Sequence, residues 1–202
     1  MATETPSLAP SPPSNAYTII EPPHRHTWTS GDLLGVSHDD RYQYELIRGE
    51  LRRMSPASHR HGRLEVRLIV AIGKYLEAHP LGEVFSGDTG FVLEDAPLTI
   101  RAPDVAFVAA ERIPADAPAF LPLAPDLVIE IISPSETARS IAEKVSDYLR
   151  TGTRLLWLVY PEQQEVQAYA PDQPFHIYRS TDALDGRGIL PGFHYLLRDL
   201  FA

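Results

Sequence analysis

The segment PDLVIEIISPS, residues 125–135, constrains the fold most, because it places one carboxylate, Glu130, among five large aliphatic residues. Apolar residues occur on both alternating faces of this segment, which is typical of a strand covered on both sides. An ionised carboxylate without a partner is strongly unfavourable in such a strand. The chain must therefore supply a partner for Glu130: a bound cation, or a buried basic residue such as Arg101 or Arg154.

The composition is typical of one soluble globular domain. The 202 residues are 44% hydrophobic and 22% charged, and they include no cysteine. Disulfide bonds and cysteine-based zinc sites are therefore excluded. No apolar run reaches membrane-spanning length and no secretion signal is recognisable, so we expect a cytoplasmic protein that does not associate with membranes.

The net charge argues against a broadly basic surface for nucleic acid. The chain has 27 acidic and 18 basic residues, which gives a formal net charge of −9. A local basic strip can still carry phosphate contacts, and a site built from carboxylates also raises the acidic count.

Proline divides the chain into an arm and a domain. Residues 1–26 contain six prolines between alanine, serine and threonine, a composition that predicts a disordered or loosely docked arm. His24 and His26 lie in this arm, where solvation is a better interpretation than metal binding. Residues 27–202 are predicted to form a single domain.

Hydrophobic periodicity and breaking residues predict the elements of this domain. The pattern alternates around Arg48-Gly49, which indicates a hairpin. Helices are expected at about 29–36, 58–79 and 136–150, the last ended by Gly152. Strands are expected at about 84–86, 91–93, 105–108, 127–132, 154–161, 165–170 and 175–180, with a short helix or edge segment at 193–202. This order predicts a mixed α/β (α+β) fold around one central mixed sheet flanked by helices.

Two carboxylates are candidates for one metal site. Asp104 follows Pro103 at the start of an apolar strand, and Glu130 is the only charge inside the next long strand. If the two strands are neighbours, both side chains lie at the same end of the sheet. Mg²⁺ prefers oxygen ligands and commonly takes one or two protein carboxylates. The alternatives are a turn residue for Asp104 and an ion pair for Glu130.

Lys144 is the candidate cation opposite these acids. It borders the apolar stripe of the second long helix, one turn from both Ile141 and Tyr148. A lysine there can lay its stem along the core and direct its ammonium group at the end of the sheet. It would then bind phosphate or orient water. A solvated helix lysine is the competing interpretation.

The first long helix begins with histidines, arginines and one acid. His61 and Glu65 are four residues apart, which places them on one helix face. With His59 they also suggest zinc, although that pattern lacks a clear third ligand. Arg60, Arg63 and Arg67 make this helix locally basic and are candidate phosphate contacts, although each can equally be a solvated surface charge.

These features together resemble the PD-(D/E)xK nuclease superfamily, and more specifically the Uma-two family of restriction-endonuclease-like proteins. The resemblance covers nearly all of the chain from about Thr27 to the C-terminus, and four segments in order carry it. They are YELIRGELRRMSPASHRHGRL, RAPDVAFV, PDLVIEIISPSE and EKVSDYLRTGTRLLWLVYP.

The resemblance implies a restriction-endonuclease-like core with an N-terminal hairpin and a C-terminal β extension. It assigns metal binding to Asp104 and Glu130, and catalytic support to a lysine. The lysine position of the superfamily motif is occupied by Ile132, which points to Lys144 on the following helix. Glu65 matches, more loosely, an acid on the first helix of many members.

The activity implied is Mg²⁺-dependent (or Mn²⁺-dependent) cleavage of DNA phosphodiester bonds by metal-activated water, in a homodimer. Two other functions stay open. One is a non-catalytic binding or regulatory module, because fold alone does not establish function. The other is a hydrolase of a different phosphate ester, for which we expect a narrow pocket rather than an open cleft.

Overall fold

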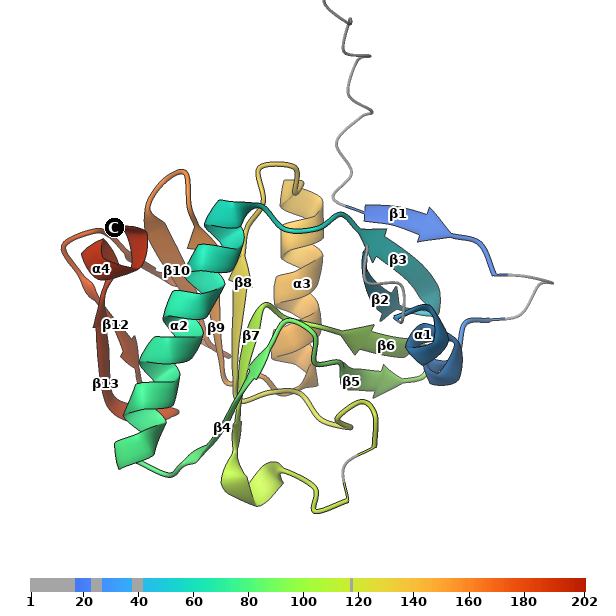
Figure 1. Cartoon of the computed structure of the whole chain (residues 1–202), viewed down its shortest axis with the longest axis horizontal. Coiled ribbons are helices and arrows are strands. Elements are labelled where there is room, and N and C mark those ends of the chain that lie inside the picture. Colours follow the sequence, from blue (N-terminus) through green and yellow to red (C-terminus); the bar gives the residue numbers. More distant parts are fainter. Residues whose placement is uncertain (1–16, 23–26, 38–41, 117) are drawn as a thin grey trace, which may run out of the picture.

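The computed structural model describes residues 17–22, 27–37, 42–116 and 118–202, and its elements are shown in Figure 1. The fold is mixed α+β, as the sequence predicts. Its centre is a six-stranded mixed sheet in the order β11-β10-β9-β8-β7-β4. The strands are β4 (Gly82–Ser86), β7 (Val105–Ala109), β8 (Leu127–Ile131), β9 (Leu155–Tyr160), β10 (Glu165–Tyr169) and β11 (His176–Tyr178).

A second sheet of five strands, in the order β1-β3-β2-β6-β5, lies beside the central one. Its strands are β1 (Tyr17–Ile20), β2 (Gln43–Ile47), β3 (Glu50–Met54), β5 (Phe91–Asp95) and β6 (Leu98–Arg101). The predicted N-terminal hairpin is β2–β3, and its two-residue turn has positive φ at both Arg48 (50°) and Gly49 (79°). A turn with this backbone geometry matches the twist of the two flanking strands. Its positive φ at the second position explains why Gly49 occurs there.

Strand β1 lies inside the segment that the proline content predicted to be an arm. All four of its residues pair with β3, from Tyr17 opposite Met54 to Ile20 opposite Leu51. This part of the segment is therefore docked on a sheet edge. Residues 1–16 and 23–26 of it, including His24 and His26, lie outside the described residues.

The central sheet is covered on both faces. Helix α2 (His59–Ala78) buries Leu64, Leu68 and Ile72 against one face, in a core that includes Trp157. Helix α3 (Ala138–Thr151) packs on the opposite face. Alternation along β8 directs Val128 and Glu130 toward α3 and Ile129 toward α2. The only charge of this strand therefore faces the helix that carries Lys144.

The remaining elements lie outside the two larger sheets. They are α1 (Ser30–Val36), the 3₁₀ turn Ala110–Arg112, the hairpin β12 (Ala183–Gly186) and β13 (Leu190–Leu196), and α4 (Leu197–Phe201). The hairpin β12–β13 and α4 pack in the same core as α2 and form the expected C-terminal β extension. No helix in the described part of the chain is long and apolar enough to cross a membrane.

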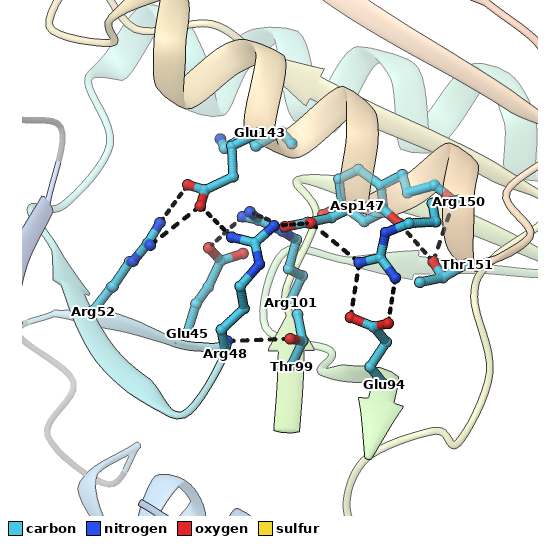
Figure 2. A network of polar contacts seen from close by, with 12 residues as sticks. Glu45, Arg48, Arg52, Glu94, Thr99, Arg101, Glu143, Asp147, Arg150 and Thr151 are labelled. Carbon is cyan, nitrogen blue, oxygen red and sulfur yellow. Dashed lines mark hydrogen bonds and ion pairs between the residues drawn. The ribbon is translucent and has the colours of Figure 1, made fainter. Parts of the chain in front are cut away.

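An ion-pair network joins the five-stranded sheet to α3 (Figure 2). Arg101, at the end of β6, is only 2% exposed. Its guanidinium donates to Glu45 of β2 at 3.0 Å and, through Nη2, to Asp147 of α3 at 2.7 Å. Around this centre, Arg48 also binds Asp147, at 2.6 Å, and Arg52 binds Glu143 at 2.6 Å. These contacts fix the position of α3 relative to β2, β3 and β6.

Replacement of Arg101 by methionine should be strongly destabilising, because it leaves the buried carboxylates of Glu45 and Asp147 without their shared cation. We expect a loss of about 3–5 kcal/mol in the free energy of unfolding, measured by urea denaturation. Arg154→Met is the control, because the side chain of Arg154 is 56% exposed in its pair with Asp126. The control should lose less than about 1 kcal/mol. Equal losses in the two variants would contradict a structural role for the network.

The stability of the protein should depend on Glu143 in acid. Burial opposes ionisation, but hydrogen bonds from Arg52 and Arg48 and the charges of Arg52 and Arg101 lower the pKa of Glu143 to about 2, from an ordinary value of 4.5. The stabilisation is therefore complete above pH 4.5 and is lost as the pH falls toward 2. Between pH 4.5 and 2, the free energy of unfolding of Glu143→Gln should fall by about 2 kcal/mol less than that of the wild type.

Thermal unfolding at pH 2.5, 3.5, 4.5 and 6 measures this dependence. Glu162→Gln is the control, because the side chain of Glu162 is 61% exposed in its pair with Arg60. The control should follow the wild-type pH profile. A Glu143→Gln profile as steep as that of the wild type would contradict the assignment.

Candidate active site

A cleft of about 650 Å³ lies where the β2–β3 hairpin, the start of α2 and the segment between β8 and α3 meet. Five of the candidate site residues named from the sequence line it: Arg60, His61, Asp104, Glu130 and Lys144. They come from α2, the start of β7, β8 and α3. The fold therefore brings together residues that are up to 84 positions apart in the chain (144 − 60).

Glu130 has two internal partners. Its side chain is almost fully buried; Oε2 accepts from Lys144 Nζ at 2.8 Å and Oε1 accepts from Tyr148 Oη at 2.7 Å. Lys144 is thus the basic residue that the buried strand required. The two arginines considered for this role bind elsewhere. Arg101 binds Glu45 and Asp147, and Arg154 binds Asp126.

Burial shapes the protonation of this pair. It raises the pKa of Glu130 to about 7, against the opposing effect of the Lys144 charge and with a further rise from Asp104. Burial alone would lower the pKa of Lys144, but Glu130 and Glu136 raise it well above its usual value. Lys144 therefore stays an ammonium group, and a proton or a second cation competes with it for Glu130.

Asp104 lies at the same end of the sheet as Glu130. Strands β7 and β8 are antiparallel neighbours with Val105 opposite Ile129, so the residues next to this pair meet at one edge. Asp104 Oδ2 accepts from the backbone N–H of Ile131 at 2.6 Å. The carboxylate is thereby fixed next to Glu130, as expected if the two strands were neighbours.

His61, in the first turn of α2, holds the other oxygen of Asp104. Its Nε2 lies 2.9 Å from Asp104 Oδ1. Burial tends to lower the pKa of His61, but the hydrogen bond and the charge of Asp104 raise it above its ordinary value overall. The His61 ring therefore acts as a support for Asp104 on the side facing α2.

Glu65 lies behind this arrangement and does not line the cleft. It accepts a long hydrogen bond, 3.4 Å, from the backbone N–H of Gly87. Burial and, to a smaller extent, the charge of Asp104 raise the pKa of Glu65. Its electrostatic coupling to Asp104 and His61 places it next to the site, on the α2 side.

The donor set suits a hard divalent cation with few protein ligands. Asp104 and Glu130 offer carboxylate oxygens at one edge of the cleft, which is the ligand type that Mg²⁺ prefers. Among the described residues, no three His, Asp or Glu side chains are grouped closely enough to hold a metal ion by themselves. A zinc site at His59, His61 and Glu65 has no such group to support it. A cation at Glu130 must share an oxygen with one of its two partners or displace it, Lys144 at Oε2 or Tyr148 at Oε1.

The three arginines of α2 do not form one basic strip. Arg60 lines the cleft and pairs with Glu162 at 2.8 Å. Arg67 instead donates to the backbone carbonyls of Leu200 at 2.8 Å and Ala202 at 2.5 Å, and Arg63 is exposed outside the cleft. Of these three candidate phosphate contacts, only Arg60 lines the cleft, because successive side chains of a helix point in different directions.

Three further side chains belong to the site and were not recognised from the sequence. They are Tyr148, which donates to Glu130, Glu136, which lies 3.1 Å from Lys144, and Glu45, which binds Arg101. Tyr148 could have been found, because it lies one helical turn after Lys144 on the face that packs on the sheet. Glu45 carried no such signal, since it reaches the site through long-range packing, whereas Glu136 is placed by the local turn between β8 and α3.

The fold defines the class of protein. The structure is similar to the crystal structure of a protein from Anabaena variabilis described as "a putative nuclease belonging to DUF820". The TM-score is 0.71 and the identity is 21%, over 78% of this chain and 89% of the other. The central mixed sheet flanked by helices is thus the fold of that protein.

The sequence defines the family. Residues 32–198 match Uma2, a family described as "Putative restriction endonuclease". The chain belongs to this family, in agreement with the resemblance carried by the four sequence segments. No curated protein matches the chain.

Proposed function

We propose that the protein is a Mg²⁺-dependent endonuclease that hydrolyses phosphodiester bonds of DNA. The observation that carries the proposal is the meeting of Asp104, Glu130 and Lys144 in one cleft, with contacts that link all three through β8. Two carboxylates beside an ammonium group can hold a divalent cation and a phosphate together. Family membership and the nuclease-type fold support the same function.

Each side chain has a distinct role in this proposal. Asp104 and Glu130 bind the cation, which when present polarises the phosphate and lowers the pKa of bound water. His61 and Tyr148 hold the two carboxylates in place through their hydrogen bonds. Lys144 keeps a positive charge at the cleft, where negative charge develops on the phosphate.

The shape of the cleft supports a polymer rather than a small ester. Its lining extends from Tyr17 on β1, past the acids, to Glu162 beyond β9. We take the spread of these lining residues over several elements to favour an extended strand over a single phosphate ester. In a homodimer, which the family resemblance implies, two such sites would be available for the two strands of a duplex.

The metal site can be tested without a substrate by calorimetric titration of Mn²⁺. The wild type should bind Mn²⁺, and Glu130→Ala should lose this binding because one of the two carboxylates is removed. Glu162→Ala is the control, since it removes an exposed acid at the edge of the same cleft. The absence of Mn²⁺ binding in the wild type would favour the non-catalytic module instead.

Lys144→Ala should lower Mg²⁺-dependent nicking of a supercoiled plasmid by about 100-fold or more, while Mn²⁺ binding persists. The protein has one other lysine, Lys74, which is exposed on α2 and provides the matched control Lys74→Ala. Nicking by Lys144→Ala at the wild-type rate would remove this lysine from the mechanism.

Arg60 and Arg67 should differ in their effect on DNA binding. Arg60→Ala should weaken binding and lower the slope of log affinity against log salt by about 0.9, as expected for one lost phosphate contact. Arg67→Ala should leave both unchanged, because its guanidinium binds carbonyls at the C-terminus. Fluorescence anisotropy over a range of salt concentrations measures the slope. A larger effect of Arg67→Ala would place the DNA on another surface.

A further inference from the structure

Lys144 is shared between two carboxylates. Its Nζ lies 2.8 Å from Glu130 Oε2 and 3.1 Å from Glu136 Oε2. Glu136 precedes α3, and its side chain is only 7% exposed. Its Oε2 is buried and makes no well-aligned hydrogen bond in the described structure, so the nearby ammonium group provides its compensation.

The turn between β8 and α3 fixes the position of Glu136. The backbone N–H of Ser133 donates to Glu136 Oε1 at 3.1 Å, and the N–H of Glu136 donates to the carbonyl of Ser133 at 3.0 Å. These two bonds close a tight turn and leave Oε2 directed at Lys144. The orientation is therefore set by the backbone and does not depend on Glu130.

The other acids near Lys144 are already engaged. Four carboxylates act on its charge: Glu130, Glu136, Glu45 and Asp104. Glu45 accepts from Arg101 and from the N–H of Ala102. Asp104 accepts from the N–H of Ile131 and contacts His61. Apart from Glu130, Glu136 is the only one of these acids that contacts Lys144 directly in the described part of the chain, through Oε2 at 3.1 Å.

We propose that Glu136 is a positioning residue that holds Lys144 at the cleft independently of Glu130. The inference deepens the proposed function, because it explains how Glu130 can bind a cation without loss of the lysine. If Lys144 left Glu130 and had no second carboxylate to contact, its buried ammonium group would be strongly unfavourable. With Glu136 in place, Lys144 keeps one partner while Glu130 exchanges the ammonium group for the metal ion.

Amine labelling tests this role without metal or substrate. The chain has two lysines, so pulse acetylation followed by mass spectrometry reports Lys144 directly, with exposed Lys74 as the internal standard. In Glu130→Gln alone, Lys144 should be acetylated nearly as slowly as in the wild type. The double variant Glu130→Gln, Glu136→Gln should label it about tenfold faster, because a lysine without a carboxylate partner has a lower pKa. Fast labelling in Glu130→Gln alone would overturn the proposal.

Mn²⁺ calorimetry provides a second measurement that does not require the double-acid variant to fold. Glu136→Gln should weaken Mn²⁺ binding by about 10- to 100-fold, the usual effect of losing an outer partner of a metal site. In the Lys144→Ala background the same substitution should have no effect, since no ammonium group then needs a second partner. An equal loss in both backgrounds would make Glu136 a direct metal ligand and overturn the positioning role.

The two measurements also separate this inference from the proposed function. Absence of Mn²⁺ binding in the wild type would contradict the metal-dependent nuclease. Slow labelling in Glu130→Gln together with fast labelling in the double variant would still establish that Glu136 holds Lys144.

Discussion

The site depends on one buried cation that is not part of its chemistry, Arg101. Its guanidinium lies between Glu45 of the five-stranded sheet and Asp147 of α3. Arg101 ends β6, and Asp104 follows three residues later at the start of β7. Asp147 lies three residues after Lys144 on the same helix. One ion-pair centre therefore positions both the segment that carries the first carboxylate and the helix that carries the lysine.

A buried cation shared by two acids occurs twice at the interface between α3 and the sheets. Arg101 is shared by two acids, and Lys144 is shared by Glu130 and Glu136. Buried pairs of this kind add little net stability compared with apolar packing, but removal of one member leaves an uncompensated charge. They therefore act mainly by fixing one geometry. A further consequence is that the cleft carries closely spaced charges of both signs before any ligand arrives.

The sequence predicted the elements whose burial pattern is strong and local. Helices α2 and α3 follow from their apolar stripes, and β8 follows from its apolar run. The unfavourable burial of Glu130 correctly required an internal partner or a cation. Strands β6 and β12 were not predicted, and β6 is stabilised by its pairing with β2 and β5. Strand β1 was missed because a proline-rich composition gives no sign of a docking edge.

The site residues were likewise predictable where local patterns place them and not where distant contacts do. The pairing of β7 with β8 could be supposed from two apolar strands, and it brought Asp104 to Glu130. The direction of Arg67, by contrast, depends on the C-terminal carbonyls of Leu200 and Ala202, more than 130 residues away. Glu45 reaches the site only through Arg101. Contacts of this range are set by the assembled sheets and not by local sequence.

The most direct test of the account is an anomalous diffraction map of crystals soaked in Mn²⁺. We expect one anomalous peak in contact with carboxylate oxygens of Asp104 and Glu130, with Lys144 Nζ moved from Glu130 to Glu136. A map with no peak at these acids and Lys144 still bound to Glu130, from crystals in which Mn²⁺ is bound elsewhere, would contradict the account. The buried lysine would then serve only to neutralise the charge of the strand.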